Sequence, residues 1–156
     1  MPATSTFVRS DSEDETRAFG ARLAAALQPG DLVALEGELG SGKTVLVQGI
    51  AQGLNVSDQV HSPTFVLHHR YAGRVPLDHY DLYRLEGLGW LDTGLDEPSP
   101  DAVTVVEWSE RAGALRSWAT IRIRLAAEGP HTRVISLLQG TPAVRACFDG
   151  TAPARA

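Results

Sequence analysis

The chain has 156 residues, of which 43% are hydrophobic and 21% are charged, and its formal net charge is −5. These proportions describe one globular domain, and the length excludes a second full domain. An acidic chain does not bind nucleic acid through its net electrostatic potential, because binding to the phosphate backbone needs clustered Lys and Arg. The fourteen basic residues are thirteen arginines and a single lysine, Lys43.

The composition favours a cytoplasmic protein with no membrane contact. Cys147 is the single cysteine and has no Cys or His partner at zinc-ligand spacing, which suits a reducing compartment. The N-terminal segment lacks the basic stretch and apolar run of a signal peptide. No later apolar run approaches the roughly 18 residues that span a bilayer.

Hydrophobic spacing predicts the elements of the first third of the chain. Ser12 and Glu15 form a capping-box pattern that opens a helix, and Pro29-Gly30 ends it. A short apolar run follows, as expected of a strand buried on both faces. The predicted elements are a strand over 6–9, a helix over 12–27, a strand over 32–35 and a helix over 43–54.

The rest of the chain is dominated by predicted strands. Two hairpins are expected, and the first has a second strand that begins at Pro76, which predicts an edge position. The predicted strands cover 65–71, 76–81, 103–106, 121–125 and 134–138, whereas residues 85–100 give no clear pattern. We therefore expect one α/β domain over 1–140 with a mixed sheet, followed by a disordered tail over 141–156.

Residues 37–44 read GELGSGKT and match the phosphate-binding pattern G-x-x-x-x-G-K-[ST] between a predicted strand and a predicted helix. This phosphate-binding loop (P-loop) predicts a P-loop NTPase-like three-layer sandwich with a mixed parallel and antiparallel sheet. Lys43 is expected to reach the β- and γ-phosphates, and Thr44 to place its hydroxyl on Mg²⁺. The residues expected around the nucleotide are Gly37, Glu38, Leu39, Gly40, Ser41, Gly42, Lys43, Thr44, Val45 and Trp108.

The single lysine narrows the choice of nucleotide. All thirteen other basic residues of the chain are arginines. Lysine is retained at position 43, where a compact charge on an unbranched side chain must fit into a loop that surrounds phosphate. The guanine-reading N-K-x-D motif needs a second lysine, which this chain lacks. ATP is therefore favoured over GTP.

Glu107 directly follows the apolar run 103–106, and ligands of open α/β sheets bind at the carboxyl ends of the strands. It is a candidate for metal binding, although an exposed acid at a strand end fits the position equally well. Trp108 beside it is expected either to border the nucleotide or to be a core or rim residue.

The segment 79–84, HYDLYR, concentrates polar side chains at the end of a predicted strand. Asp81 is a candidate for holding Mg²⁺ through water or for orienting the attacking water. Asp78 competes with it by type, but alternation along a strand places the two on opposite faces, so only one should face the site. Arg84 either neutralises charge on the phosphates or forms a surface salt bridge.

Two further sequence features, a Ser-Pro segment and a group of arginines, are each compatible with two interpretations. Ser62-Pro63-Thr64-Phe65 fits a nucleotide-sensing loop or a Ser-Pro turn before a strand. Four arginines near the last hairpin fit a basic patch for a partner or a solvated face. They are Arg116, Arg122, Arg124 and Arg133.

GELGSGKT, SPTF, HYDLYRL and VVEWSE, in this order, resemble the bacterial TsaE (YjeE) family. The resemblance covers the chain from the helix near its start to about Glu110, and more loosely the last hairpin. It implies a P-loop ATPase of tRNA threonylcarbamoyladenosine biosynthesis whose ATP hydrolysis resets a TsaB–TsaD heterodimer between turnovers. Contact with tRNA is then only indirect, through the complex.

The resemblance implies Mg²⁺ contacts for Thr44 and Glu107 and a required acid at Asp81. Together with Lys43, Asp81 and Glu107 are the expected catalytic residues. The sequence departs from the family pattern where Val45 replaces a second threonine, so a hydroxyl contact to the α-phosphate is lost. Residues 86–90 replace an acidic stretch, and Pro130 stands where a late arginine is common, so contacts at those positions do not carry over.

The leading hypothesis is therefore Mg²⁺-dependent ATP hydrolysis coupled to a partner. A P-loop small-molecule kinase is an alternative from another enzyme class, although no acceptor-binding insert is evident. A module that switches partner affinity on ATP without hydrolysing it is the non-enzymatic alternative.

Overall fold

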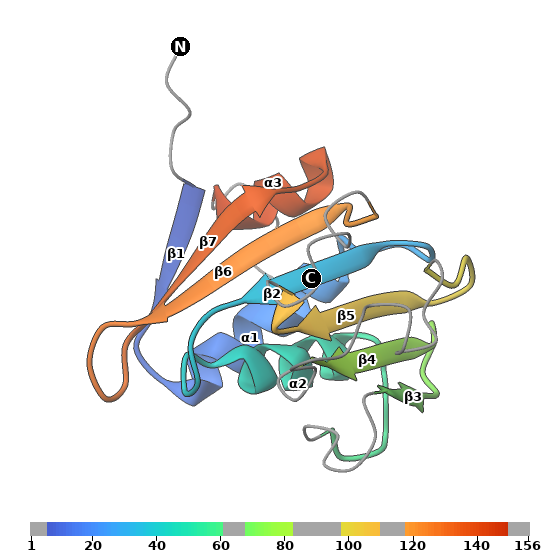
Figure 1. Cartoon of the computed structure of the whole chain (residues 1–156), viewed down its shortest axis with the longest axis horizontal. Coiled ribbons are helices and arrows are strands. Elements are labelled where there is room, and N and C mark those ends of the chain that lie inside the picture. The colour runs from blue at the N-terminus through green and yellow to red at the C-terminus, as the bar shows by residue number, and fades with distance from the viewer. Residues whose placement is uncertain (1–5, 61–67, 83–97, 110–117, 150–156) are drawn as a thin grey trace.

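The computed structural model describes residues 6–60, 68–82, 98–109 and 118–149. These residues form a seven-stranded sheet with the strand order β1-β7-β6-β2-β5-β4-β3, and three helices (Figure 1). The strands are β1 (Thr6–Ser10), β2 (Leu32–Glu36), β3 (His68–Tyr71), β4 (Leu77–Asp81), β5 (Val103–Glu107), β6 (Ile121–Ala127) and β7 (Arg133–Gln139). The helices are α1 (Glu13–Ala24), α2 (Lys43–Gly53) and α3 (Pro142–Phe148).

The sheet is parallel in its centre and antiparallel at both sides. β6, β2, β5 and β4 run parallel to one another, whereas β7, β1 and β3 pair antiparallel with their neighbours. The predicted α/β fold with a mixed sheet is thus confirmed. The carboxyl ends of β2, β5 and β4 meet at one edge of the sheet, where the P-loop begins.

The described helices all pack on one face of the sheet. A single apolar cluster joins Leu23 of α1, Ile50 of α2 and Phe148 of α3 to strand residues such as Val33 and Val105. β2 and β5 are buried along their whole length. On the opposite face Leu32, Ala34 and Val106 form a smaller cluster. The described residues therefore supply one helical layer of the predicted three-layer sandwich.

The start of α1 follows the predicted capping pattern, and its end differs. The Glu15 N–H donates to Ser12 Oγ at 3.0 Å, while the Glu15 carboxylate accepts from the Asp11 N–H. The α-helix ends at Ala24, and the chain continues to Leu27 through N–H bonds to carbonyls three residues back. These tighter turns carry the helical spacing of apolar residues past the helix end.

α1 and α2 lie side by side on the same face of the sheet (Figure 1), and glycines stand at their contact. A Cβ on Gly49 of α2 would lie 2.2 Å from the Arg17 carbonyl oxygen of α1, and one on Gly20 of α1 would lie 2.6 Å from the Leu46 carbonyl oxygen. Only glycine fits so close a backbone contact. α2, which starts at the P-loop, is thereby fixed against α1.

Two sequence expectations about the sheet and the tail differ from the structure. β4 lies between β5 and β3 and is not at an edge. Pro76 precedes the strand and accepts a bond from the Val103 N–H through its carbonyl, so its missing N–H costs the sheet nothing. Residues 65–67 of the predicted preceding strand lie outside the described residues.

The segment after Thr141 forms a helix where a tail is expected. The Thr141 hydroxyl caps α3 by accepting from the Val144 N–H, and Pro142 occupies the first turn. Val144, Cys147 and Phe148 are buried, and Phe148 packs edge-on against Phe19 of α1 with ring centroids 4.9 Å apart. Three apolar side chains on one face of a short helix suffice to dock it. The predicted domain limits of 1–140 and 141–156 otherwise stay a prediction.

Within the described ranges, no helix combines the length and the apolar character that crossing a bilayer requires.

Candidate functional site

The P-loop connects the buried strand β2 to helix α2. Its first residue, Gly37, has φ +148°, and a Cβ there would lie 2.4 Å from the Leu125 carbonyl oxygen of β6. The N-cap of α2 is Gly42, which offers no side-chain oxygen to the helix, and the first turn of α2 contains no acidic residue. No side chain of this turn opposes an anion at the positive end of the helix dipole, so the start of α2 is suited to binding one.

Lys43 points back into the loop from the first turn of α2. Its ammonium donates to the carbonyl oxygens of Gly37 and Glu38 and, at 3.3 Å, to Ser41 Oγ. The same nitrogen lies 4.0 Å from the ring centroid of Trp108, a cation–π contact. The ammonium group of Lys43 is thus held within the loop, and its predicted contact with the phosphates stays a prediction.

Thr44 and Glu107 meet across the gap between α2 and β5. The Thr44 hydroxyl donates to the Glu107 carboxylate, with 3.0 Å to Oε1 and 3.3 Å to Oε2. Glu107 is buried, so the interpretation of an exposed strand-end acid is wrong. The structure brings together the two residues predicted to share a metal.

His79 of β4 completes this cluster. Its Nε2 lies 2.6 Å from Glu107 Oε2, its side chain is fully buried, and no described residue bonds to its Nδ1. Glu107 is therefore held from both sides, by a hydroxyl from the P-loop helix and by an imidazole from the neighbouring strand. The sequence singled out the HYDLYR segment but gave His79 no role; its position two residues before Asp81, on the same strand face, is the signal that could have found it.

Asp81 and Asp78 lie on opposite faces of β4, as alternation predicts. Asp81 pairs with Glu107 in the parallel register of β4 and β5, on the face of His79 and the P-loop. Asp78 faces the other way and is buried, and one of its carboxylate oxygens bonds to His68 Nε2 at 2.9 Å and lies 3.8 Å from Arg70. Burial, together with the nearby Asp78 charge, raises the pKa of Tyr80 on that outer face.

The oxygen donors of Thr44 and Glu107 fit a magnesium ion. Mg²⁺ takes hard oxygen ligands, and protein sites commonly supply one or two of them while phosphate oxygens and water complete the shell. Within the described residues no group of three or more His, Cys, Asp or Glu could hold a metal by itself. The donor set therefore suits a metal brought in with a nucleotide better than a closed structural site.

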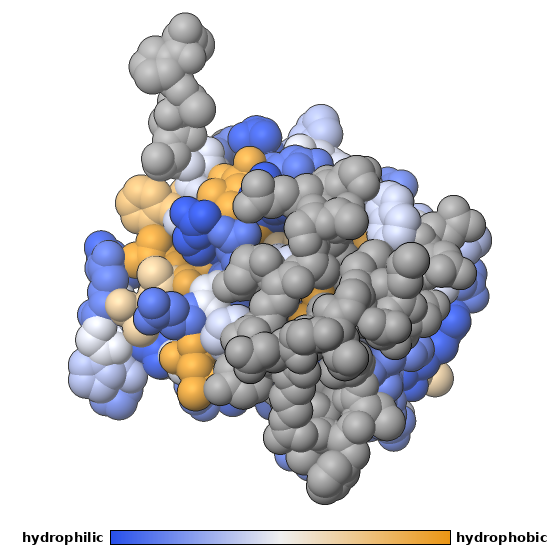
Figure 2. Space-filling model, in the orientation of Figure 1, coloured by the Kyte–Doolittle hydropathy of each residue, from blue (hydrophilic) through white to orange (hydrophobic). Residues whose placement is uncertain are grey.

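The arginines of the last hairpin do not form one basic patch in the structure. Arg122 and Arg124 lie on the outer face of β6, where both guanidinium groups approach the carboxylate of Glu36. Arg133 lies on the helix-covered face instead, beside the P-loop. Figure 2 shows apolar and polar side chains mixed over β1, β7 and β6, in agreement with the half-exposed Phe7. Arg84, Arg116 and the segment 62–65 lie outside the described residues.

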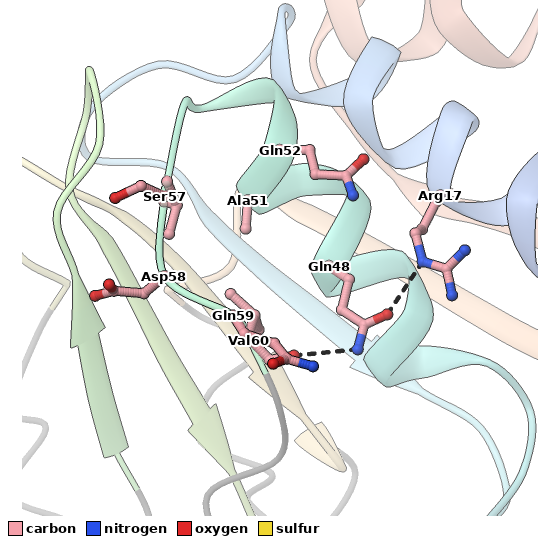
Figure 3. Close-up of a pocket in the computed structure, with 9 residues that line it drawn as sticks. Arg17, Gln48, Ala51, Gln52, Ser57, Asp58, Gln59 and Val60 are labelled. Carbon is pink, nitrogen blue, oxygen red and sulfur yellow. Dashed lines mark hydrogen bonds between the residues drawn. The ribbon is translucent and has the colours of Figure 1, made fainter.

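A cavity of about 430 Å³ lies on the outer side of α2, away from the P-loop (Figure 3). It is lined by Arg17 of α1, Gln48 and Gln52 of α2, and the segment 56–60. Gln48 bridges this region, because its Oε1 accepts from Arg17 and its Nε2 donates to the Val60 carbonyl oxygen. None of the predicted site residues lines this cavity.

Comparison with known proteins finds a family model and relatives that carry the same protein name. The family model described as threonylcarbamoyl adenosine biosynthesis protein TsaE matches residues 10–135. A protein of Streptomyces coelicolor named tRNA threonylcarbamoyladenosine biosynthesis protein TsaE is 46% identical over 114 residues, which cover 70% of this chain and 76% of the relative. A protein of the same name from Treponema pallidum is 40% identical over 124 residues, covering 77% of this chain and 92% of the relative.

A solved structure agrees with the fold. The crystal structure of Bacillus subtilis YdiB superimposes with a TM-score of 0.68 at 26% sequence identity, and the match covers 97% of both chains.

Proposed function

The chain belongs to the TsaE family of threonylcarbamoyl adenosine biosynthesis proteins, and on that premise we propose that it is a magnesium-dependent ATPase that drives tRNA threonylcarbamoyladenosine formation. The proposed partner is a TsaB–TsaD-like heterodimer, which carries out the transfer to tRNA while this chain hydrolyses ATP. We place this activity in the cytoplasm.

The contact between Thr44 and Glu107 beside Lys43 carries the proposal. Many glycine-rich turns contain a lysine and bind no phosphate. Here, however, the hydroxyl of Thr44, the residue after the lysine, lies 3.0 Å from the buried carboxylate of Glu107 at the end of β5, the parallel neighbour of β2. In P-loop enzymes the hydroxyl after the lysine and an acidic side chain together hold Mg²⁺, and Thr44 and Glu107 would hold it here. A structural turn would not need to bury a carboxylate at that point.

Each residue has a chemical task in this scheme. The N–H groups of the loop bind phosphate oxygens, and Lys43 leaves the loop carbonyls to contact the β- and γ-phosphates. Thr44 and Glu107 would hold Mg²⁺, which when bound offsets the negative charge on the terminal phosphates. Asp81, on the same strand face as His79, would orient the attacking water, and Trp108, which lies beside Lys43 in the structure, would border the nucleotide.

The proposal is tested by measuring ATP hydrolysis and multiple-turnover tRNA modification with a TsaB–TsaD complex. Lys43→Ala and Glu107→Gln are expected to lower both rates by about 10²–10³, the usual cost of losing one preorganised charge stabiliser. Glu128→Gln is the matched control, since Glu128 is exposed and pairs only with Arg9 among the described residues. Equal modification by wild type and Lys43→Ala would refute the proposal.

A non-hydrolysable ATP analogue separates hydrolysis from simple gating. The ATPase proposal expects one round of modification with the analogue and many with ATP. Sustained turnover with the analogue would favour the ATP-gated binding module instead.

A further inference from the structure

Arg133 lies against the P-loop although it comes from the far end of the chain. It is the first residue of β7, on the face of the sheet that α2 covers. A Cβ placed on Gly42, the N-cap of α2, would lie 3.6 Å from Arg133 Cγ and 3.7 Å from its Cδ. The aliphatic stem of this arginine therefore packs on the loop at the point where the helix begins.

The guanidinium of Arg133 has no carboxylate partner among the described residues. Its Nη1 donates to the carbonyl oxygens of Gly129 and Thr132, both in the turn between β6 and β7. Other arginines near the same edge are paired, Arg9 with Glu128 and Arg124 with Glu36. A guanidinium carries five N–H donors, so bonds through one nitrogen leave most of its capacity for another acceptor.

The direction of a bound nucleotide follows from the strand order. A Mg²⁺ ion held by Thr44 and Glu107 would keep the terminal phosphates on the β5 side of β2, since Glu107 stands at the end of β5. β6 and β7 lie on the other side of β2. The α-phosphate and the nucleoside would then leave the loop toward the β6 and β7 side, where Arg133 and Leu125 flank Gly42.

We propose that Arg133 binds the α-phosphate end of the nucleotide. The stem stays packed on Gly42 while the guanidinium turns from the hairpin carbonyls to the phosphate oxygens, a charge-assisted contact that suits the planar donor fork of arginine. The side chain of Val45, the residue after Thr44, is apolar and offers the α-phosphate no hydroxyl. Arg133 of β7 would supply the hydrogen-bond donor that α2 lacks at this position. This inference rests on the proposed ATPase function.

The contact predicts a separation of KM from kcat. The α-phosphate keeps its charge while the γ-phosphate is hydrolysed, so Arg133 stabilises the bound substrate and the transition state equally. Arg133→Met keeps most of the stem and removes the charge. It is expected to raise the KM for ATP and the Kd for ADP by about tenfold to hundredfold, the range for a lost hydrogen bond to a charged group, with kcat within about twofold.

Arg74→Met is the matched control. Arg74 also donates to a backbone carbonyl, that of Gly53, and has no described carboxylate partner, but it lies at the opposite end of α2. Thermal unfolding is measured for each variant, and if Arg133→Met does not fold, Arg133→Lys serves for the same comparison with a smaller expected rise in KM.

Unchanged KM and Kd in the Arg133 variants, or a fall in kcat alone, would overturn the inference while leaving the ATPase proposal intact. A wild-type protein that binds no ATP, or binds it equally well after Lys43→Ala, would overturn both.

Discussion

His79 shows how a buried residue can serve the proposed site through another side chain, that of Glu107. It holds Glu107 Oε2 at 2.6 Å while Thr44 holds the same carboxylate from the other side. Partners of metal-binding carboxylates fix the orientation of the ligand oxygens, and their loss typically costs 10- to 100-fold in metal affinity or activity. His79 is therefore a positioning residue in the proposed site.

Replacing His79 should raise the Mg²⁺ concentration needed for half-maximal ATP hydrolysis. His79→Leu removes the donor to Glu107, and a shift of about 10- to 100-fold is expected, with partial recovery in His79→Gln, whose amide can still donate. The measurement is a Mg²⁺ titration of ATPase activity. His68→Gln is the control, because His68 bonds to Asp78 on the other face of β4. The same titration curve for His79→Leu and wild type would contradict this role.

Cys147 should make the fold sensitive to alkali. Burial raises the pKa of its thiol above the usual 9.0, so the folded state keeps the proton when the unfolded chain has lost it. This contribution to stability is complete below pH 9 and declines as the pH rises from there toward the folded-state pKa. Urea unfolding from pH 8 to pH 10.5 is expected to show a smaller loss for Cys147→Ser. A slope unchanged by that substitution would show that the thiol titrates alike in both states.

Local residue patterns predicted the P-loop residues and Glu107 because each follows directly from a neighbour in sequence. GELGSGKT places Lys43 and Thr44 at the first turn of a helix, and an apolar run places Glu107 at a strand end. Spacing places His79 on the strand face of Asp81, but its contact with Glu107, like the contact of Arg133 with the P-loop, depends on which strands are neighbours. No spacing in the sequence encodes the order β7-β6-β2-β5-β4. The sequence alone therefore does not distinguish a P-loop contact for Arg133 from a solvated position.

At the scale of elements, the glycine contact between α1 and α2 fixes the position of the P-loop helix relative to α1. Gly20 and Gly49 allow two backbones to approach to distances that any side chain would prevent. The bond from Arg17 of α1 to Gln48 of α2 adds a polar link beside this contact (Figure 3). The start of α2, and with it the loop, is thus positioned by α1 as well as by β2.

Gly49→Ala is expected to destabilise the protein by about 2 kcal/mol. The new methyl group would overlap the backbone carbonyl of Arg17, so the overpacking cost lies at the upper end of its usual range, about 3 kcal/mol, and the higher helix propensity of alanine offsets about 1 kcal/mol of it. Chemical unfolding measures the change. Gln52→Ala, at an exposed position of the same helix, should be neutral within about 0.5 kcal/mol. A stabilised Gly49→Ala variant would mean that the helices separate at low cost.

Strand patterns were predicted more reliably than strand neighbours. The alternation of Ile121, Ile123 and Leu125 with Arg122 and Arg124 gave β6 and its two faces correctly. The edge position predicted for β4 was wrong. Proline is confined to edge strands because it has no N–H to donate to a neighbouring strand, but Pro76 precedes the first residue of β4 and no strand hydrogen bond requires its N–H. Among the described strands the edge on this side of the sheet is β3, which contains no proline.

At the scale of the whole molecule, α3 ties the C-terminal segment to the core. Phe148 packs against Phe19, and Cys147 and Val144 join the same apolar cluster as β7. The sequence did not predict this helix because seven residues with three apolar side chains give too short a pattern, and the partner that buries them lies over a hundred residues earlier.

Phe148→Ala should lower the free energy of unfolding by about 3–5 kcal/mol, the usual cost of removing a buried aromatic ring. Thermal unfolding would show this as a lower Tm. Arg145→Ala on the same helix is the control, because its side chain is exposed. A loss below about 1 kcal/mol for Phe148→Ala would restore the expectation of a tail that contributes little to the domain.

The ammonium of Lys43 over the ring of Trp108 gives the protein a spectroscopic reporter of its own. Indole emission responds to a nearby charge, and a nucleotide that draws Lys43 onto its phosphates takes that charge off the ring. With Trp90→Phe and Trp118→Phe, Trp108 becomes the single indole, and its emission would follow ATP binding without an attached dye. The same signal would be absent in Lys43→Ala, so occupancy of the loop could be timed separately from hydrolysis and from the reaction on tRNA.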